Sequence, residues 1–211
     1  MIKKKICIVV NSRANYARIK TVLKEISNEK NLQLQLVIGA SALLDRFGDL
    51  TDLVEKEGFK ISGKIYSIVE GENPTTMAKS TGLAIIELSS LFENLKPDIV
   101  LTVADRFETL ATAIAASYMN IPLAHTQGGE VTGSIDESVR HAITKLSHIH
   151  FPATKLAKKN IIRMGENPKN IYLTGCPSID LISNINSKIS QKLLSSYGGV
   201  GPEIDPKKPY L

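Results

Sequence analysis

Residues 125–140, HTQGGEVTGSIDESVR, combine glycines and acids in the way that acid–base chemistry at a ligand site requires. A short apolar run at 121–124 precedes them and is typical of a buried strand, and a helical pattern follows at 134–146. A strand that opens into a glycine-containing loop and then a helix is where open α/β sheets bind ligands. The acids of this loop are Glu130, Asp136 and Glu137. Carboxylates at such a position indicate proton transfer.

The same acids also have a purely structural interpretation. Asp136 and Glu137 fall in the first turn of the expected helix, where negative charge favours the helix dipole. Ser134 is the expected N-cap of that helix. The local sequence is compatible with both interpretations.

A further acid follows the preceding apolar run. Residues 99–103 are a predicted strand, and Asp105 comes directly after it. Neighbouring strands of a parallel sheet lie roughly 5 Å apart, so we expect Asp105 to converge with the acids of the glycine-containing loop. Clustered carboxylates raise one another's pKa. This arrangement suits an acid–base pair that works near neutral pH.

Other kinds of site fit the sequence less well. A carboxylate-bound metal is disfavoured, because no histidine–carboxylate spacing resembles a ligand set. A Ser–His–Asp hydrolase is disfavoured by the lack of a G-x-S-x-G motif. The loop after the first predicted strand lacks G-x-G-x-x-G, so the dinucleotide fingerprint is absent. We therefore expect neither a metal nor a cofactor.

Composition narrows the class of protein. A hydrophobic content of 43% with 22% charged residues is that of a soluble globular protein. The net charge is +5, but the lysines are scattered or lie on helix faces with few aromatic residues between them, so a solvated surface is favoured over a nucleic-acid patch. Cys7 and Cys176 predict no disulfide framework. With no stretch of signal-peptide or transmembrane character, we expect a cytoplasmic protein that binds neither nucleic acid nor membrane.

Apolar runs alternate with helical patterns along the chain. The predicted strands are 5–10, 32–38, 60–68, 99–103, 121–124, 148–151 and 171–174. The predicted helices are 14–26, 41–47, 51–57, 74–95, 107–119, 134–146, 154–164 and one that starts within 175–180. This alternation predicts an α/β fold with a doubly wound, parallel, Rossmann-like sheet.

The end of the chain has a different character. The pattern loosens from Ser187, residues 197–211 are linker-like, and the last three residues are typical of the start of another strand. We expect a Rossmann-like domain at residues 1–186, and a linker with the beginning of a truncated second domain at 187–211.

Four pieces of the sequence resemble the hydrolysing UDP-N-acetylglucosamine 2-epimerases of sialic and legionaminic acid biosynthesis. They are SRANY from Ser12, ADR from Ala104, HTQGGEVTGSIDESVRHAITKLSH from His125 and GCPSID from Gly175. The third piece is long and specific. The resemblance implies the N-terminal half of a two-domain, glycosyltransferase-like (GT-B) enzyme that binds a UDP-sugar between its two Rossmann-like halves. It also implies a homo-oligomer, either a dimer or a tetramer, and little activity in the N-terminal half alone.

The reaction that the resemblance implies begins with removal of the proton at carbon 2 of the sugar. UDP is eliminated through a glycal-like intermediate, and water then adds to release the free 2-epimeric sugar. The sugar would be N-acetylglucosamine or its diacetamido analogue, N,N'-diacetylbacillosamine. A carbon acid beside an acetamide is weak, so its base needs near-attack geometry, and UDP leaves best when its charge is neutralised.

The resemblance also carries the site residues. Asp105, Glu130 and Asp136 match the catalytic carboxylates, and Glu137 is the alternative to Asp136. The sequence does not divide the roles of base and acid among them.

The substrate-binding residues follow in the same way. Arg13 matches an arginine on the phosphate side, and Arg140 is expected to orient the carboxylates. His125 and His141 are expected to line the cleft, with packed histidines as the favoured alternative. Gln127 stands where several relatives have glutamate, which shifts the expected catalytic acid to Glu130.

Three alternative functions stay open. A non-hydrolysing epimerase would return an epimerised nucleotide sugar, but GGE and IDESVRH resemble the hydrolysing branch more closely. A non-catalytic sugar-nucleotide-binding module is a second alternative. A retaining glycosyltransferase of the same fold is a third, and the acid-rich loop disfavours it.

Overall fold

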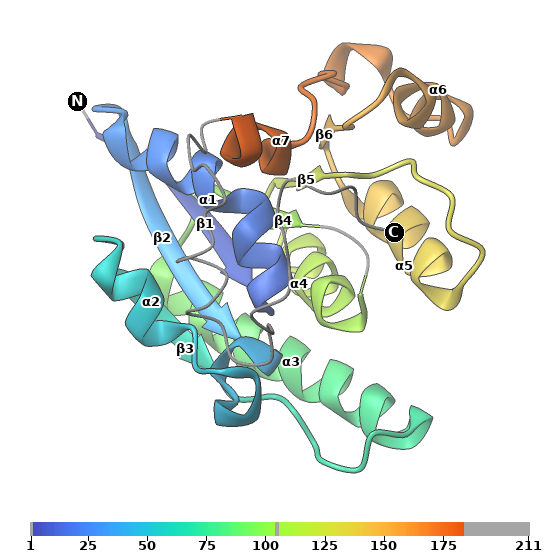
Figure 1. The fold of residues 1–211 in the computed structure, drawn as a ribbon. Coiled ribbons are helices and arrows are strands. Elements are labelled where there is room, and N and C mark those ends of the chain that lie inside the picture. Colours follow the sequence, from blue (N-terminus) through green and yellow to red (C-terminus); the bar gives the residue numbers. More distant parts are fainter. Residues whose placement is uncertain (1, 104–105, 184–211) are drawn as a thin grey trace, which may run out of the picture.

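Six parallel strands form the centre of the part of the chain that the computed structural model describes, residues 2–103 and 106–183. Their spatial order is β3-β2-β1-β4-β5-β6, which is the order of the doubly wound dinucleotide-binding folds. The strands are β1 (Lys4–Val10), β2 (Leu32–Gly39), β3 (Ile61–Ile65), β4 (Ile99–Val103), β5 (Leu123–Thr126) and β6 (Ile149–Phe151). The predicted Rossmann-like α/β fold is confirmed (Figure 1).

Helices cover both faces of this sheet. They are α1 (Arg13–Asn28), α2 (Thr51–Lys56), α3 (Pro74–Leu95), α4 (Phe107–Tyr118), α5 (Ile135–Leu146), α6 (Lys155–Arg163) and α7 (Pro177–Ser183). On one face, α3, α4 and α5 bury apolar side chains against Cys7 and Val9 of β1. On the other face, α1 and α2 pack over Ile8 and Val10. Strands covered on both sides need continuous apolar runs, which is why β1 lacks polar–apolar alternation.

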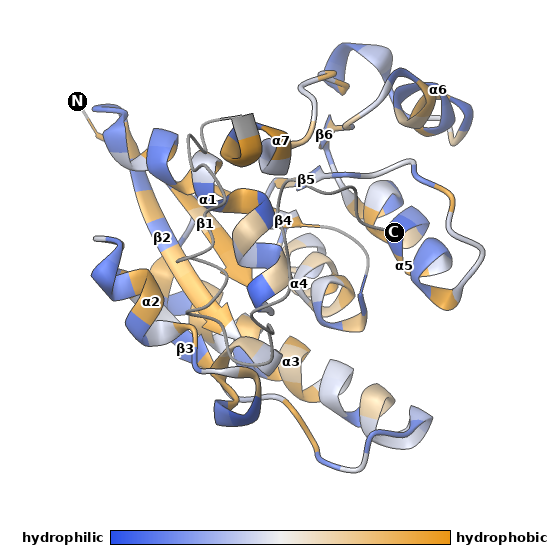
Figure 2. Ribbon diagram, viewed as in Figure 1, coloured by the Kyte–Doolittle hydropathy of each residue, from blue (hydrophilic) through white to orange (hydrophobic). Residues whose placement is uncertain are grey.

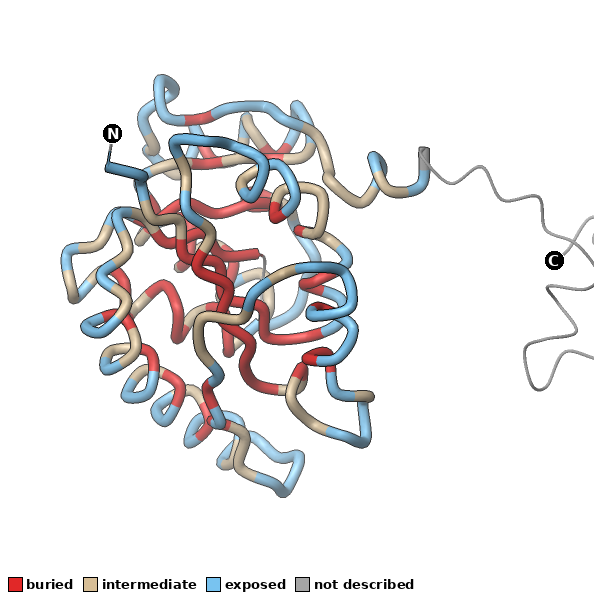
Figure 3. Tube along the Cα trace, turned by 90° about the vertical axis from the view of Figure 1, so that its left-hand side faces the viewer, coloured by how far each residue is buried: buried red, intermediate tan, exposed pale blue. Residues whose placement is uncertain are grey.

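The pictures agree with this division. Figure 2 shows β1 and β2 mostly orange, and therefore apolar, at the centre, with helices around them that mix blue and orange residues. Figure 3 shows the same central strands buried, with exposed turns along the outside of the helices. The hydrophobic effect therefore fixes the sheet between two apolar layers, and the polar residues at its carboxyl edge are carried by the loops.

Helix starts at this edge are set by local hydrogen bonds. At the start of α1, the Ser12 side chain accepts from the backbone N–H of Asn15 at 3.1 Å. At the start of α3, Asn73 and Thr76 form a reciprocal capping box just before and after Pro74. A proline in the first turn costs no helix hydrogen bond, because its missing N–H would have no partner there.

Two predicted elements differ from the structure. The predicted strand at 171–174 is reduced to one bridge between Ile171 and His150, because Tyr172 and Leu173 turn outward to solvent. The predicted helix at 41–47 is two 3₁₀ turns, Ala40–Leu43 and Asp45–Phe47, because Leu44 between them has an extended backbone.

The strand before the acid-rich loop also has different limits. It was predicted at 121–124, and β5 instead ends at Thr126. His125 pairs with Thr102 of β4 and with His150 of β6, so backbone hydrogen bonds on both sides extend the strand through polar residues. His125 is therefore part of the sheet. The acid-rich loop between β5 and α5 consists of residues 127–134.

The predicted boundary between residues 186 and 187, and the predicted linker and second domain after it, lie outside the described residues. Within the described ranges, none of the helices combines the length and the apolar character needed to cross a membrane.

Candidate functional site

Arg13 lies where β1 leads into α1, at the carboxyl edge of the sheet. It is the first residue of this 16-residue helix, and its Nε donates to the carbonyl oxygen of Gly48 at 3.0 Å. Gly48 has a φ of 72°, and a Cβ there would lie 2.6 Å from Nη2 of Arg13. The glycine thus gives the arginine room to lie across the loop after β2. An exposed guanidinium beside a helix N-terminus is suited to hold an anion.

Asp105 lies outside the described residues. Val103 before it and Arg106 after it are described, and they define the end of β4 and the start of α4. Val103 is the last residue of β4 and pairs with Thr126 of β5, so the predicted neighbouring of these two strands is confirmed. Arg106 is the N-cap of α4, and its Nε lies 3.5 Å from Oε2 of the buried Glu108. Convergence of Asp105 with the acids after β5 stays a prediction.

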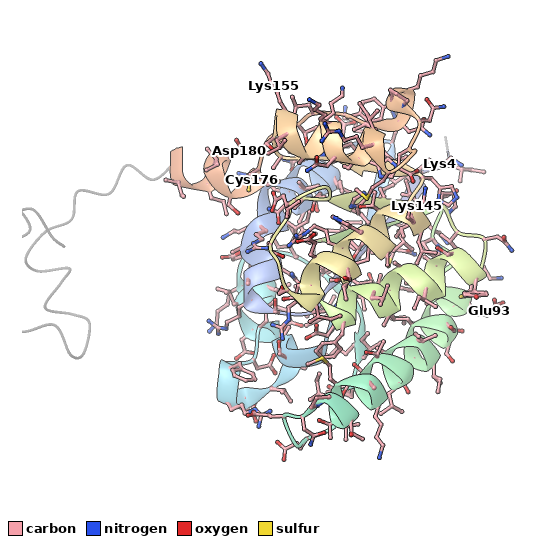
Figure 4. The ribbon with its side chains drawn as sticks, turned by 90° about the vertical axis from the view of Figure 1, so that its right-hand side faces the viewer. Lys4, Glu93, Lys145, Lys155, Cys176 and Asp180 are labelled. Atoms are coloured by element: carbon pink, nitrogen blue, oxygen red, sulfur yellow. The ribbon has the colours of Figure 1, made fainter. Side chains whose placement is uncertain are left out.

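Gln127 is the first residue after β5 and is buried in a strained conformation. Its φ is 58°, a left-handed backbone that costs a non-glycine residue about 1–2 kcal/mol. Its side-chain oxygen accepts from Nη1 of Arg18 at 3.3 Å, and its Nε2 donates to Sγ of Cys176 at 3.2 Å. Gln127 therefore joins α1, β5 and the segment that enters α7, where Figure 4 labels Cys176. Strained backbone of this kind is often found at functional sites.

The two glycines that follow are required by close contacts. A Cβ on Gly128 would lie 2.0 Å from Cε1 of His125, inside the imidazole ring's van der Waals envelope. A Cβ on Gly129, whose φ is 79°, would lie 2.3 Å from the carbonyl oxygen of Ala157. Nδ2 of Asn160 donates to the carbonyl oxygen of Gly129 at 2.8 Å. The turn is thus held between β5 and α6.

Glu130 is held through its main chain by Arg140. The buried Arg140 donates from Nη1 to the carbonyl oxygen of Glu130 at 2.9 Å and to Oγ1 of Thr132 at 3.5 Å. Glu130 is half-buried and lines a cavity of about 320 Å³. The other lining residues are Gly129 and Val131 of the loop, and Thr154, Leu156, Ala157 and Asn160 at the start of α6. Arg140 therefore fixes the path of the loop, and Glu130 faces the α6 side of it.

Glu137 supports the same loop from the first turn of α5. Its Oε2 accepts from the backbone N–H groups of Thr132 at 2.8 Å and Gly133 at 2.7 Å. These two hydrogen bonds lower the pKa of Glu137 below its usual value. Ser134 occupies the N-cap position, as expected, but its side chain makes no cap hydrogen bond.

Asp136 and His141 flank Glu137 on α5. Asp136 is half-buried in the same first turn, so the predicted placement of both acids there is confirmed. His141 lies one turn later, with Nε2 3.8 Å from Oε1 of Glu137. Its side chain is about one-third exposed.

His125 has the packed position that the sequence allowed as an alternative. It is fully buried, and its Nε2 lies 2.7 Å from Nδ1 of His150. Burial, with the nearby His150, lowers the pKa of His125 to about 3, so this imidazole is neutral at physiological pH. The expectation that His125 lines the cleft is therefore corrected, since its side chain has no exposed surface.

Several residues that build this edge were not predicted from the sequence. They are Arg18, His150, Asn160 and the half-buried Cys176. His150 had a usable signal, because it falls at the paired position of the neighbouring strand once β5 is extended to His125. Among residues 2–103 and 106–183, no cluster of three or more histidine, cysteine, aspartate or glutamate side chains is arranged to hold a metal ion.

Comparison with known proteins gives the family. The model of the UDP-N-acetylglucosamine 2-epimerase family matches residues 24–203. The chain is 40% identical over 187 residues to the GDP/UDP-N,N'-diacetylbacillosamine 2-epimerase (hydrolyzing) of Campylobacter jejuni, covering 88% of this chain and 48% of that protein. It is 36% identical over 205 residues to the UDP-N,N'-diacetylbacillosamine 2-epimerase (hydrolyzing) of Legionella pneumophila, covering 97% and 53%. The chain thus spans about half the length of these curated relatives.

A solved structure agrees with the fold. The UDP-N-acetylglucosamine 2-epimerase of Neisseria meningitidis, bound to UDP-GlcNAc, superposes with a TM-score of 0.75 at 23% identity, covering 85% of this chain and 48% of that one. At this identity the structural match supports the fold alone. The family assignment rests on the sequence, through the family model and the two curated relatives. The chain belongs to the UDP-N-acetylglucosamine 2-epimerase family.

Proposed function

We propose that this chain is the carboxylate-bearing part of a hydrolysing UDP-sugar 2-epimerase. The observation that carries the proposal is the similarity, at 40% and 36% identity, to two enzymes whose names specify the hydrolysing reaction. The acid-rich loop after β5 supports it, because acids at the carboxyl end of a parallel strand are suited to proton transfer on a bound ligand.

Two substrates fit the proposal. UDP-N,N'-diacetylbacillosamine is favoured by the two relatives named for it. UDP-N-acetylglucosamine is supported by a 30% identical UDP-N-acetylglucosamine 2-epimerase of Neisseria meningitidis. The products would be free sugars of the kind used for legionaminic or sialic acids, and a 30% identical polysialic acid biosynthesis protein of Escherichia coli is consistent with the second. The free cysteines Cys7 and Cys176 are consistent with action in the reducing cytoplasm.

The chemistry begins at carbon 2 of the sugar. A carboxylate removes the carbon-2 proton, and the C–H electron pair forms a double bond to carbon 1. The bond between carbon 1 and the UDP oxygen breaks, and UDP leaves with the electron pair of that C–O bond. Water then adds across the double bond. Its hydroxyl bonds to carbon 1, and a proton bonds to carbon 2 on the face opposite to the one from which the first proton was removed. The net result is UDP and the free 2-epimer.

Asp105, Glu130 and Asp136 are the carboxylates that we propose for these proton transfers. Glu137 is the weaker candidate, because its Oε2 already accepts two backbone hydrogen bonds and its lowered pKa makes it a poorer base. The division of base and acid among the three stays open.

The departing diphosphate would be neutralised at the start of α1. Arg13 supplies a fixed charge there, and the N-terminus of α1 adds the positive end of the helix dipole. Arg140 contributes indirectly, because its contact with the Glu130 carbonyl fixes the loop that carries the acids.

The test uses a full-length protein that contains this chain, with each UDP-sugar in turn. We expect release of UDP and of a free 2-epimeric sugar, and loss of both in Asp105→Asn and Asp136→Asn. Retention of UDP on an epimerised sugar would support the non-hydrolysing alternative. Absence of both reactions would favour a sugar-nucleotide-binding module.

A parallel assay addresses the 211 residues alone. We expect them to turn over negligibly, because the relatives that they match are about twice as long. Full epimerase activity of the isolated chain would overturn this expectation. Assembly into a homo-oligomer is likewise a prediction, to be measured by sedimentation.

A further inference from the structure

A line of polar side chains runs through the protein beneath the acid-rich loop, separate from the proposed catalytic carboxylates. Nε2 of His125 on β5 lies 2.7 Å from Nδ1 of His150 on β6, with the rings edge to face at 87°. Nε2 of His150 lies 3.5 Å from Oε2 of Glu166, whose other oxygen contacts the amino group of Lys145. Figure 4 labels Lys145 on α5. The line therefore connects the interior of the sheet with its surface.

The order of this line determines which nitrogen donates. Glu166 is an acceptor, so it favours a proton on Nε2 of His150. Nδ1 of His150 is then an acceptor, and Nε2 of His125 must donate to it. The tautomer of His125 is thereby set with its proton on Nε2, and its ring orientation is fixed by a buried hydrogen bond.

The ring of His125 in turn supports the Gly128–Gly129 turn from below. Its Cε1 occupies the space that a side chain at Gly128 would need. From the other side, α6 holds Gly129 through the Asn160 hydrogen bond and the close carbonyl of Ala157. The turn is thus clamped between an imidazole and a helix, and Glu130 is the next residue of the chain.

We propose that the hydrogen-bonded His125–His150 pair is a positioning unit that sets the place of Glu130 in the active site. This inference rests on the proposed function. Neither histidine touches substrate, since both are buried and His125 has no exposed surface. They act through the Gly128–Gly129 turn. A displacement of about 1 Å in a catalytic group can lower a rate by about 100-fold, so a small rotation of the supporting ring is enough to affect turnover.

The test compares His150→Leu with His150→Asn in a full-length protein. Leucine removes the acceptor for His125, whereas Oδ1 of asparagine can take the place of Nδ1 and still accept the hydrogen bond. We expect His150→Leu to lower kcat by about 10- to 100-fold with KM for the UDP-sugar changed by less than about twofold. His150→Asn should restore most of kcat. Because a partly unfolded sample would also lower kcat at constant KM, kcat is expressed per folded protein, with the folded fraction measured by circular dichroism, and rescue by His150→Asn then separates positioning from loss of folded protein.

A second readout follows the turn itself. Amide hydrogen exchange at Gly129 and Glu130 should be faster in His150→Leu than in the wild type or His150→Asn, because the ring beneath the turn is no longer fixed. If His150→Leu does not fold, His125→Gln takes its place: it keeps a donor for His150 but removes the ring, and should give the same loss of kcat and faster exchange.

The outcomes are distinct. Wild-type kcat in His150→Leu, or an equal loss of kcat in the leucine and asparagine variants, would overturn the positioning role while leaving the proposed function intact. A wild-type protein that releases no UDP would instead overturn the proposed function, and with it the catalytic meaning of the pair.

Discussion

Oε2 of Glu137 accepts a hydrogen bond from the backbone N–H of Gly133 at 2.7 Å, and a second from Thr132. This contact closes the acid-rich loop onto the first turn of α5. Two neighbouring acids of one motif therefore have different surroundings: Glu137 is held by the backbone, and its pKa is lowered as a result. We infer that Glu137 maintains the loop and that Asp136 is the acid available for proton transfer.

Replacement of these two acids should separate their roles. We expect Asp136→Asn to reduce UDP release by at least about 100-fold, because general acid–base catalysis contributes roughly that factor or more. Glu137→Gln retains an acceptor oxygen and should lose less than about tenfold. Steady-state assays of both variants provide the measurement. The opposite order, with Glu137→Gln the more damaged, would make Glu137 the catalytic residue.

Glu137 should also affect stability at low pH. Its pKa in the folded protein is lower than in the unfolded chain, so the folded state gains from its charge above the unfolded value of about 4.5. That gain is lost as the pH falls through the lower folded pKa. Urea unfolding from pH 5 down to about pH 3 should show a smaller acid loss in Glu137→Gln than in the wild type. Identical pH curves would mean that the contact does not persist in solution.

Gly128→Ala tests the contact with His125. The new methyl would lie 2.0 Å from Cε1 of His125, so the ring or the turn must move, at a cost of about 1–3 kcal/mol in unfolding free energy. Gly82→Ala is the matched control, because that helical glycine has open space around its Cβ position and should gain about 0.5–1 kcal/mol. Chemical denaturation measures both. Equal stability of Gly128→Ala and the wild type would show that the turn lies further from the ring.

Burial of His125 predicts a second pH effect, in a higher range. Its folded pKa is about 3 and its unfolded value is 6.5, so below pH 6.5 the unfolded chain binds a proton that the folded protein does not. Stability is therefore complete above pH 6.5 and falls as the pH drops, by at most about 1.4 kcal/mol per pH unit. Unfolding measured between pH 7 and about pH 5, before carboxylates titrate, reports this effect together with that of the neighbouring His150, whose pKa burial also lowers. His125→Gln should flatten the slope, and an unchanged slope would assign it to other groups.

Arg13→Ala should weaken nucleotide binding. Loss of one charge-assisted contact to phosphate costs about 1.5 kcal/mol, which is roughly tenfold in Kd for UDP. Arg163→Ala, at an exposed arginine on α6, is the control and should bind UDP as the wild type does. Calorimetric titration of the full-length protein with UDP compares them. Equal Kd values in the two variants would remove Arg13 from the phosphate site.

The sequence predicted the parts of this fold that hydrophobic periodicity controls. The strand at 99–103 and the helix at 74–95 have the predicted limits, because an apolar run and an asparagine–proline start are local signals. The end of β5 was missed because His125 and Thr126 are polar, whereas pairing with β4 and β6 decides that they are in the strand. Backbone pairing between distant segments has no local signature.

The site was predictable in its residue types more than in its contacts. The motif indicated Asp136, Glu137 and Arg140, and the structure places them on α5 beside the loop. The backbone hydrogen bonds of Glu137 and the pairing of His125 with His150 depend on loop path and strand register, which spacing along the chain does not specify. Asp105 lies outside the described residues, so its convergence with Glu130 and Asp136 stays a prediction.

The most direct test of the central claim is the isotopic content of the sugar released in deuterium oxide. A full-length protein that contains this chain should convert its UDP-sugar to UDP and a free 2-epimer that carries deuterium at carbon 2, as read by NMR. Deuterium there requires that the carbon-2 proton was removed and replaced from solvent, which is the step we assign to the carboxylates after β4 and β5. A released sugar that keeps its original hydrogen at carbon 2 would contradict the account.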